Sequence, residues 1–298
     1  MSGARIARVV MSTGNHCVVA AAEGRLERCQ LPNRRGRRPV CGDHVEWDWL
    51  RGTATIIRVL ERRNVIERGD FRGQPRPLAA NIDHILLVVA AEPAPDGLLS
   101  DRYRVLAGAM GVPLGLWVNK ADLHPHAAPA CLADLMQQHR ALGGLVHAGS
   151  ASTGAGVAAL TRALQGQTVI LVGQSGVGKS SLTQGLIPSL ELRIGAISQA
   201  SGQGRHTTTE TRLFARDDGL AIIDSPGVRT LRLDHLAPDD VDRAFPEVLE
   251  ATGHCRFRNC RHDQEPQCGV HAAIESGRLT TARLERWRSL RAETQGAL

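Results

Sequence analysis

One octapeptide constrains the fold of this chain more than any other feature. It is Gly173-Gln174-Ser175-Gly176-Val177-Gly178-Lys179-Ser180, which matches the pattern G-x-x-x-x-G-K-[ST]. In this pattern, backbone N–H groups of a glycine-rich loop surround phosphates at the start of a helix. The apolar residues 168–172 precede it, and a helical stretch at 179–186 follows. The sequence therefore predicts a strand–loop–helix unit that binds a nucleoside triphosphate, with Ser181 as the last contact.

Lysine occurs at only two of the 36 basic positions, Lys120 and Lys179, and both lie in nucleotide-binding patterns. Lysine is a compact point charge on a slim stem, whereas the guanidinium of arginine is a broad planar fork. We expect the phosphate loop to have room for a lysine side chain but not for an arginine side chain. Lys179 should therefore reach the β- and γ-phosphates as a catalytic group, and the Ser180 hydroxyl should ligate Mg²⁺.

A second pattern points to guanine as the base. Asn119-Lys120-Ala121-Asp122 follows the apolar residues 114–118 and matches the N-K-x-D box. The Asp122 carboxylate can accept hydrogen bonds from guanine N1–H and N2–H₂, which adenine does not offer. The nearby Ser150-Ala151-Ser152-Thr153-Gly154 matches the S-A-x-T-G loop that supports guanine O6. Together these residues predict GTP rather than ATP as the ligand.

The order of the patterns is unusual. Asp224-Ser225-Pro226-Gly227 follows the apolar residues 220–223 and matches the D-x-x-G box. We expect Asp224 to hold Mg²⁺ through water and the Gly227 N–H to sense the γ-phosphate. In ordinary GTPases the phosphate loop precedes the guanine boxes, but here it follows them. The sequence therefore predicts a circularly permuted GTPase domain whose last switch leads directly into residues 233–298.

Switch I is expected between 190 and 212. A threonine among residues 207–209 should complete the Mg²⁺ shell; the sequence alone does not separate the three, and we assign Thr208. Val228 stands where many GTPases carry a Gln that orients the attacking water. Another group must do this, and His206 is our candidate. The alternative for His206 is a surface histidine.

The N-terminal segment is basic and rich in short strands. Residues 1–68 hold 13 Arg against 7 acidic residues, a net charge of +6, and strands are expected at 6–10, 16–21, 45–49 and 53–59. Several short strands with turns between them favour an OB-fold barrel that binds nucleic acid. Trp47 and Trp49 should share one face, for base stacking or for core packing. The expected phosphate contacts come from one loop, at Arg34, Arg35, Arg37 and Arg38.

Four segments follow from these patterns. We predict an OB-fold at 1–68, a Pro-containing linker at 69–80, a permuted α/β GTPase domain at 81–232 and a mostly helical domain at 233–298. In the GTPase domain we expect strands at 84–90, 114–118, 145–148, 168–172 and 220–223, and helices at 99–110, 129–142, 157–164 and 179–186.

Composition indicates in which compartment such a chain is expected. The longest apolar run, 85–91, is too short to span a bilayer, and the N-terminus lacks a signal-peptide pattern. Seven cysteines, an odd number with four of them scattered, argue against a disulfide framework. We therefore expect a cytoplasmic protein without a membrane partner, and a monomer, since nothing in the sequence signals oligomerisation.

The last segment carries a candidate metal site. Cys255, Cys260, His262 and Cys268 supply three thiols and one imidazole within a short stretch. This is a closed four-ligand set suited to one structural Zn²⁺, with no open position for a catalytic water. His254 and His271 are alternatives for the imidazole ligand. The segment has little core of its own, so we expect zinc to contribute to its folding.

Across nearly the whole chain, these residues resemble the RsgA (YjeQ) family of circularly permuted GTPases that depend on the small ribosomal subunit. The resemblance implies an OB-fold, a permuted GTPase domain and a zinc domain. It also implies binding to the small subunit and its rRNA during late maturation, followed by release after subunit-stimulated GTP hydrolysis. Ser152 departs from the family, which usually has Lys there, so we expect the base to be held less tightly. The shared motifs are Ala80-Asn81-Ile82-Asp83, Asn119 to Asp122, Gly173 to Ser180, Gly204-Arg205-His206-Thr207-Thr208-Thr209, Asp224 to Gly227, Phe245-Pro246-Glu247 and the cysteine cluster.

Two other classes of function use some of the same residues. A P-loop ATPase or kinase could use the same phosphate loop, but it would have no need of Asp122. A nucleotide-regulated RNA-binding module could retain the loop as a relic, but the intact Lys179, Ser180 and Asp224 argue against that.

Overall fold

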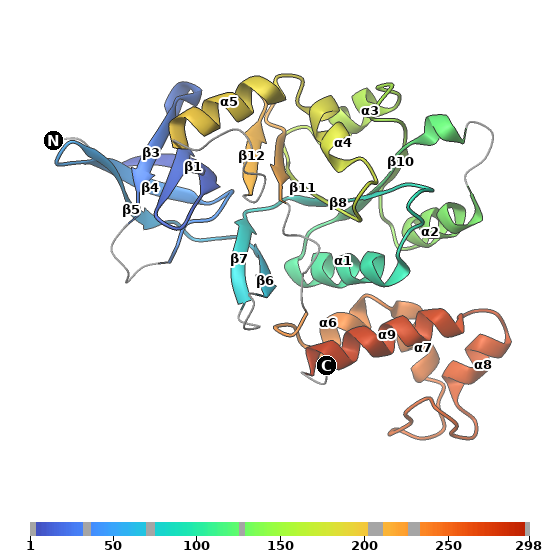
Figure 1. The fold of residues 1–298 in the computed structure, drawn as a ribbon. Helices are drawn as coiled ribbons and strands as arrows, with labels where there is room; N and C mark the ends of the chain where they lie inside the picture. Colours follow the sequence, from blue (N-terminus) through green and yellow to red (C-terminus); the bar gives the residue numbers. More distant parts are fainter. Residues whose placement is uncertain are drawn as a thin grey trace. The chain divides into compact units, whose positions relative to one another are not determined.

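The computed structural model describes residues 4–31, 37–69, 75–124, 129–201, 211–225 and 233–295. The chain forms two compact units. One comprises Met1–Pro95 and Val112–Leu231, and the other comprises Asp96–Gly111 and Arg232–Leu298 (Figure 1). None of the described helices combines the length and the apolar character that a bilayer crossing requires.

A closed five-stranded barrel forms the N-terminal part of the first unit, as predicted. Strand β1 pairs with β2 and with β4, β3 pairs with β2 and β5, and β4 pairs with β5. This order closes the barrel in the OB-fold arrangement. The strands are β1 (Arg5–Ser12), β2 (His16–Ala20), β3 (Leu26–Gln30), β4 (His44–Leu50) and β5 (Thr53–Val59), with a short 3₁₀ turn η1 (Ala22–Gly24) before β3.

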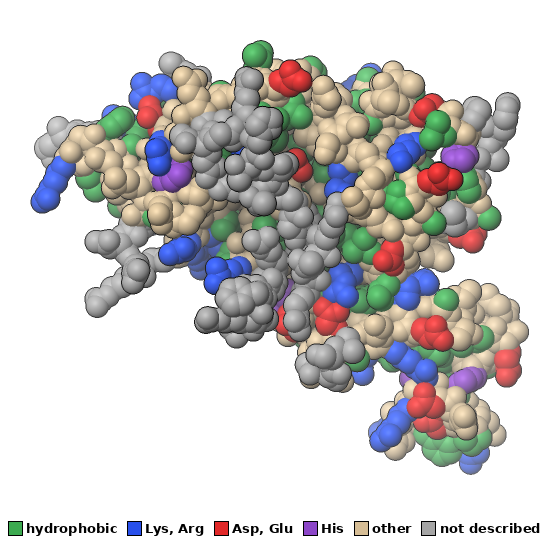
Figure 2. All heavy atoms as spheres, viewed as in Figure 1, with side chains coloured by type: hydrophobic (Ala, Val, Ile, Leu, Met, Phe, Trp, Pro, Cys, Tyr) green, Lys and Arg blue, Asp and Glu red, His purple; other side chains and the backbone are tan. Residues whose placement is uncertain are grey.

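The two barrel tryptophans have different environments. Trp47 is 1% exposed and packs in the barrel core with Val9, Val45 and Ile56, whereas Trp49 is 44% exposed. Their ring centroids lie 6.3 Å apart in an edge-to-face arrangement. Core packing therefore accounts for Trp47, and only Trp49 remains available to a partner. On the face drawn in Figure 2, basic side chains outnumber acidic ones over the barrel.

Residues expected as a linker form a hairpin instead. Strand β7 (Pro75–Ala80) pairs with β6 (Val65–Gly69) in a separate two-stranded sheet. Each strand of such a sheet has one unpaired edge, which is where proline is tolerated because it lacks an N–H to donate. Pro75 and Pro77 therefore belong to an edge strand, and not to the linker that the sequence predicted.

The nucleotide-binding part is a sheet with the order β10-β9-β8-β11-β13-β12. All neighbouring strands are parallel except β12, which pairs antiparallel with β13. Every residue of β8 and of β11 is buried, as expected for central strands of a parallel sheet. The strands are β8 (His84–Val89), β9 (Leu114–Val118), β10 (Val146–Ala148), β11 (Thr168–Val172), β12 (Arg212–Ala215) and β13 (Ala221–Asp224).

The chain reverses its direction of travel across this sheet between β8 and β11. From β8 it proceeds to β9 and β10 on one side, and it then returns to β11 on the other side. In open α/β sheets, ligands bind outside the carboxyl ends of the strands at such a switch point. The associated helices are α2 (Ala130–Ala141), α3 (Val157–Ala163) and α4 (Lys179–Leu186), with a 3₁₀ turn η2 (Ala121–Leu123) after β9.

A helix occupies the first part of the stretch expected for switch I. Helix α5 (Leu190–Ser201) contacts β2 and β3 of the barrel (Figure 1). Ile197 and Ser201 are buried, and their spacing of four residues matches the helical period. Residues 190–201 of the stretch are thus helical, residues 202–210 lie outside the described part of the chain, and the location of switch I between 190 and 212 stays a prediction.

The barrel and the parallel sheet are continuous. Strand β1 pairs with β12 at Met11 and Arg212, which makes one sheet of 11 strands. The Ala80–Asp83 motif strengthens the junction: Asp83 accepts hydrogen bonds from the Thr168 N–H (2.8 Å) and from Arg63 Nη1 (2.7 Å). Buried Asn81 holds the chain where the hairpin enters the sheet, because its amide oxygen accepts from the Arg63 N–H (3.0 Å).

The second unit is helical and includes one helix that we expected within the GTPase domain. Helix α1 (Gly97–Met110), between β8 and β9 in sequence, contacts α6 and α9. The Asp101 carboxylate accepts from Arg283 and Arg286 of α9, and Val105 belongs to the same apolar core as Phe245. These contacts group α1 with residues 233–295. The other helices are α6 (Pro238–Arg243), α7 (Pro246–Thr252), α8 (Gly269–Glu275) and α9 (Thr281–Thr294).

Candidate functional site

The phosphate loop connects β11 to α4 at the switch point of the sheet. Gly173, Gly176 and Gly178 have φ of 131°, 79° and 93°, a region that side chains with a Cβ rarely adopt. A Cβ on Gly173 would lie 2.2 Å from the Val88 carbonyl oxygen, and one on Gly178 would lie 2.2 Å from Asn119 Nδ2. The glycines are therefore required both for the turn and for its close approach to β8 and to the N-K-x-D box.

Lys179 begins α4 and folds back over the loop. Its Nζ donates to the carbonyl oxygens of Gly173 (2.8 Å) and Gln174 (2.5 Å). The ammonium therefore stands at the mouth of the loop, where the amides of the first helical turn also point. Ser180 and Ser181, in that first turn, are both exposed. A phosphate in the loop would meet one full positive charge and the positive end of a helix.

Asp224 ends β13, next to the phosphate loop. Burial raises the pKa of Asp224 above its usual range, and the nearby charges of Lys179 and Arg212 oppose that shift. A buried carboxylate of this kind favours a cation beside it. Together with the Ser180 hydroxyl it offers the oxygen ligands that Mg²⁺ prefers, so these two residues fit the predicted magnesium site.

Asn119 joins the phosphate loop to the base-binding loops. Its side chain is buried, with Nδ2 donating to the Val177 carbonyl oxygen (2.8 Å) and Oδ1 accepting from the Ala151 N–H (2.9 Å). Through these two hydrogen bonds, the Asn119 side chain joins the end of β9 to the phosphate loop and to the loop that contains Ser150. The structure brings these three separately predicted segments together at one point.

The remaining base-binding residues lie beside Asn119. Lys120 has φ of 60°, and its Nζ donates to the Glu92 carbonyl oxygen (2.7 Å). Asp122 lies in η2 and is exposed, so its carboxylate is open to a ligand. The Ser150 hydroxyl lies 2.9 Å from that of Ser152 and accepts from the Thr153 N–H (3.3 Å). Ser152, which departs from the family pattern, therefore helps to hold the Ser150 loop closed.

Several predicted residues cannot be placed. His206, Thr208, Gly227, Arg34 and Arg35 lie outside the described residues. Sequence reasoning also missed three partners, the carbonyl groups of Val177 and Glu92 and the hydroxyl of Thr211, which lies 2.9 Å from that of buried Ser225. The two carbonyls carry no signal in the sequence, because any residue type supplies one.

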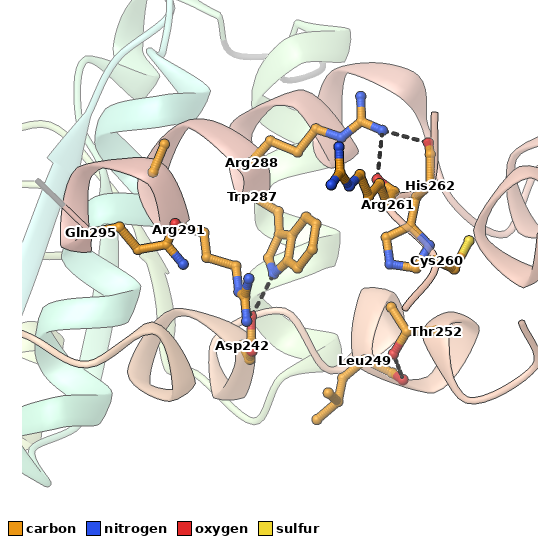
Figure 3. A pocket seen from close by; sticks show the side chains of 11 residues that line it. Asp242, Leu249, Thr252, Cys260, Arg261, His262, Trp287, Arg288, Arg291 and Gln295 are labelled. Carbon is orange, nitrogen blue, oxygen red and sulfur yellow. Dashed lines mark hydrogen bonds and ion pairs between the residues drawn. The ribbon is translucent and has the colours of Figure 1, made fainter. Parts of the chain in front are cut away.

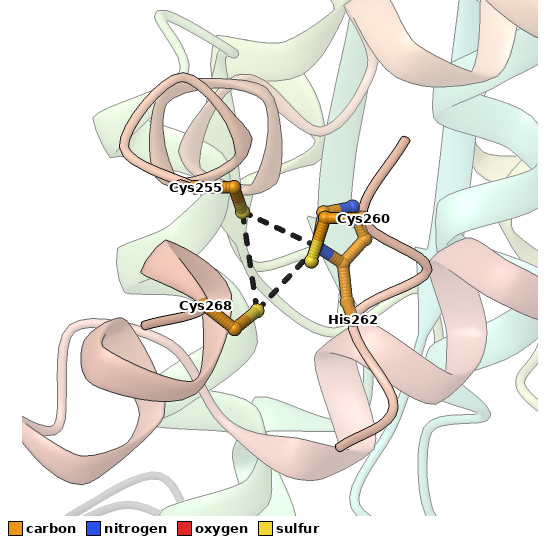
Figure 4. A group of neighbouring side chains, drawn as sticks. All are labelled: Cys255, Cys260, His262 and Cys268. Atoms are coloured by element: carbon orange, nitrogen blue, oxygen red, sulfur yellow. Dashed lines mark hydrogen bonds between the residues drawn. The ribbon is translucent and has the colours of Figure 1, made fainter. Parts of the chain in front are cut away.

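The four predicted metal ligands of the second unit converge (Figure 4). Their ligand atoms all lie within 4.8 Å of one another. Cys255 Sγ lies 3.9 Å from Cys268 Sγ and 3.5 Å from His262 Nδ1, and Cys268 Sγ lies 3.6 Å from the same nitrogen. A tetrahedral zinc with Zn–S bonds of about 2.3 Å places its sulfur ligands roughly 3.8 Å apart. Both the chemistry and the spacing therefore fit such an ion.

His262 rather than His254 or His271 completes this cluster. His271 instead points Nε2 at the His262 carbonyl oxygen (2.9 Å), and His254 is exposed. Helix α9 supports the ligand loop from one side, since Arg288 Nη2 donates to the carbonyl oxygens of His262 and of Arg261 (3.4 Å).

The cavity shown in Figure 3, of about 440 Å³, lies beside this loop. In it, Trp287 Nε1 and Arg291 Nε both donate to one oxygen of Asp242, at 2.8 and 3.1 Å. The side chains of Trp287, Arg288 and Arg291 in this cavity thus already have partners within the unit.

Comparisons with known proteins show which family this chain is similar to. The sequence model of the RsgA GTPase family matches residues 59–234. The small ribosomal subunit biogenesis GTPase RsgA of Pseudomonas aeruginosa is 40% identical over 286 residues, covering 95% of this chain and 84% of the relative. The protein of the same name from Azotobacter vinelandii is 42% identical over 289 residues, covering 95% and 83%.

Solved structures share the whole fold. YjeQ from Thermotoga maritima matches with a TM-score of 0.72 at 28% identity, covering 99% of both chains. YloQ, described as a circularly permuted GTPase, matches with a TM-score of 0.67 at 22% identity, covering 99% of this chain and 96% of the other. The resemblance seen in the sequence motifs is confirmed, and this chain belongs to the RsgA family of GTPases.

Proposed function

We propose that this protein binds and hydrolyses GTP during late maturation of the small ribosomal subunit. It binds the subunit and its rRNA in the cytoplasm as a monomer, and it leaves after the subunit has stimulated hydrolysis. The observation that carries the GTP assignment is the Asn119 bridge, because it fixes the guanine-reading residues against the phosphate loop. The names of the bacterial relatives support the assignment to the small subunit.

Each group of residues has a role in this proposal. Asp122 accepts from the guanine edge, with Lys120, Ser150 and Ala151 around the base. The phosphate loop, from Gly173 to Ser181, holds the phosphates through its amides, and Lys179 neutralises their charge. Gly227 donates to the γ-phosphate, and His206 orients the attacking water. In the barrel, Arg34, Arg35, Arg37 and Arg38 contact RNA phosphates.

Two metal ions belong to the proposal. Ser180, Thr208 and, through water, Asp224 would hold Mg²⁺ with GTP, and the ion would supply positive charge beside the phosphates. One structural Zn²⁺ is held by Cys255, Cys260, His262 and Cys268, whose thiols and imidazole leave no position for a reacting water.

The direct test is GTP hydrolysis by the purified protein, alone and with small ribosomal subunits. We expect slow turnover alone, because Val228 cannot orient water, and stimulation of at least about 10-fold by the subunit. Large subunits and ATP serve as controls and should give no stimulation. Fast hydrolysis without any subunit, or equal stimulation by both subunits, would contradict the proposal.

Exchanging Asp122 tests the choice of base. In Asp122→Asn, the amide can no longer accept both guanine protons, so GTP affinity should fall by roughly 100-fold. Xanthosine triphosphate, which offers a carbonyl at the altered position, should bind the variant better than GTP. Competition against a fluorescent guanine nucleotide measures both affinities. Unchanged GTP affinity would favour a P-loop NTPase that does not read the base through Asp122.

A further inference from the structure

A second cavity lies where the barrel, the hairpin and the parallel sheet meet. It has a volume of about 740 Å³, and we call it the seam cavity. It opens between the end of β1, the residues before β4, strand β7 and the residue before β12. The side chains that the argument uses are those of Ser12, Arg37, Arg38, Arg76 and Thr211.

Among the described residues that line the seam cavity, the charged ones are all arginines. Arg37 and Arg38 are exposed, and their side chains form no hydrogen bond or ion pair with any residue of the described ranges. The buried Asp43 carboxylate already accepts hydrogen bonds from Arg62 Nε at 2.8 Å and from the Val40 N–H at 2.7 Å. Arg37 and Arg38 therefore bring to the cavity positive charge that no carboxylate of the described residues pairs with, which favours an anionic ligand.

The lining also indicates which part of a polyanion would bind. None of the described residues that line the cavity is aromatic, so these residues offer no surface on which a base could stack. Guanidinium groups and hydroxyls are the groups that contact phosphate and sugar, and such contacts carry no sequence information. A chain of phosphodiesters fits this lining better than a free nucleotide.

The cavity is connected to the nucleotide site by one hydrogen bond. Thr211 lines the cavity, and its hydroxyl lies 2.9 Å from that of Ser225, the residue directly after Asp224. Strand β12, which starts at the next residue, pairs with β1 beside Ser12. A ligand in the cavity therefore touches residues linked to the strand end that carries Asp224.

We propose that the seam cavity binds the sugar–phosphate backbone of RNA, and that the Thr211–Ser225 hydrogen bond transmits its occupancy to Asp224. The proposal rests on the function proposed above and names the place where the RNA partner acts on the GTPase. It adds Arg76, Ser12 and Thr211, which the sequence did not single out, to the RNA-binding arginines of the barrel loop.

Binding of a labelled RNA tests the first part of the proposal, that the seam cavity binds an RNA backbone. Fluorescence anisotropy of a short fluorescein-labelled oligouridylate is measured with the full chain across a range of salt concentrations. Arg76→Gln should weaken binding by roughly 3-fold, and Arg37→Gln/Arg38→Gln by about 10-fold, with a shallower salt dependence in each. The matched controls, Arg140→Gln and Arg140→Gln/Arg162→Gln, remove exposed arginines from α2 and α3 of the same unit.

Two results, one from the control variants and one from a competitor, would overturn the claim that the cavity binds RNA. Equal losses in the cavity variants and in the controls would show that only overall charge matters. Inorganic phosphate at matched ionic strength should not displace the RNA. Displacement at low phosphate concentration would make the cavity a site for a small anion and not for RNA.

Variants of Thr211 test the second half. Thr211→Val keeps the shape but removes the hydroxyl, so the subunit should still bind while its stimulation of GTP hydrolysis falls by about 10-fold. Thr211→Ser restores the hydroxyl and should restore stimulation. If Thr211→Val is stimulated as well as the wild type, the transmission is wrong. If the wild type itself is not stimulated, the failure lies in the proposed function instead.

Discussion

GTP hydrolysis by a Lys179→Met variant is expected to fall by on the order of 100-fold or more, with or without the ribosomal subunit. Lys179 Nζ lies at the mouth of the phosphate loop, 2.8 Å from the Gly173 carbonyl oxygen, and no other lysine is near in the sequence. Methionine has a similar length but no charge, so the developing phosphate charge loses one of the positive charges beside it. Single-turnover hydrolysis of radiolabelled GTP measures the effect.

A charge-conserving variant serves as the control. Lys179→Arg keeps the positive charge, but the guanidinium needs more space and presents a planar fork to a loop already narrowed by Gly173 and Gly178. We expect it to be nearly as inactive as Lys179→Met. An active Lys179→Arg would show that the loop tolerates arginine, and the retention of lysine in this arginine-rich chain would then need another cause.

Removing the metal is expected to unfold the second unit. Structural zinc contributes about 10 kcal/mol or more of apparent free energy in small metal-dependent domains. Without it, no metal bonds join the three thiols and the imidazole, whose ligand atoms lie within 4.8 Å of one another. His262→Ala should lose its zinc, measured by mass spectrometry of the metal, and should lose helical circular dichroism and resistance to proteases within 233–295.

A neighbouring histidine provides the matched control. His254 is one residue before Cys255 and exposed, so His254→Ala should keep one zinc per chain and the wild-type helix content. If His262→Ala retained its zinc, another group would serve as the ligand, and His271 would be the first candidate. Since the phosphate loop and Asn119 belong to the other unit, the His262→Ala variant should still bind GDP.

Short sequence patterns predicted the nucleotide site because its chemistry leaves few choices. Only glycine fits at Gly173 and Gly178, and only a carboxylate at Asp122 reads guanine in this way. The junctions between elements were harder to predict. The carbonyl partners of Asn119 and Lys120 are backbone groups, and α5 is helical partly because it packs on barrel strands far away in the sequence.

Helix α1 shows the same limit at the scale of a domain. Its helical character was evident, but its membership in the second unit depends on Asp101 meeting Arg283 and Arg286, which follow it by well over 100 residues. No local sequence pattern predicts such a pairing, because an ion pair between helices far apart in the sequence produces no periodicity in either helix. Likewise, two prolines in β7 suggested a linker, since the edge position that tolerates them is a property of the folded sheet.

The continuity of β1 with β12 also bears on how the protein is made. Strand β1 is synthesised before its partner at Arg212, which follows about 200 residues later. The barrel can close through β1 and β4 as soon as β5 has emerged, because those pairings are all local to the N-terminal segment. Until β12 has been synthesised, the end of β1 in the nascent barrel therefore lacks this partner, and the two halves of the sheet join only afterwards.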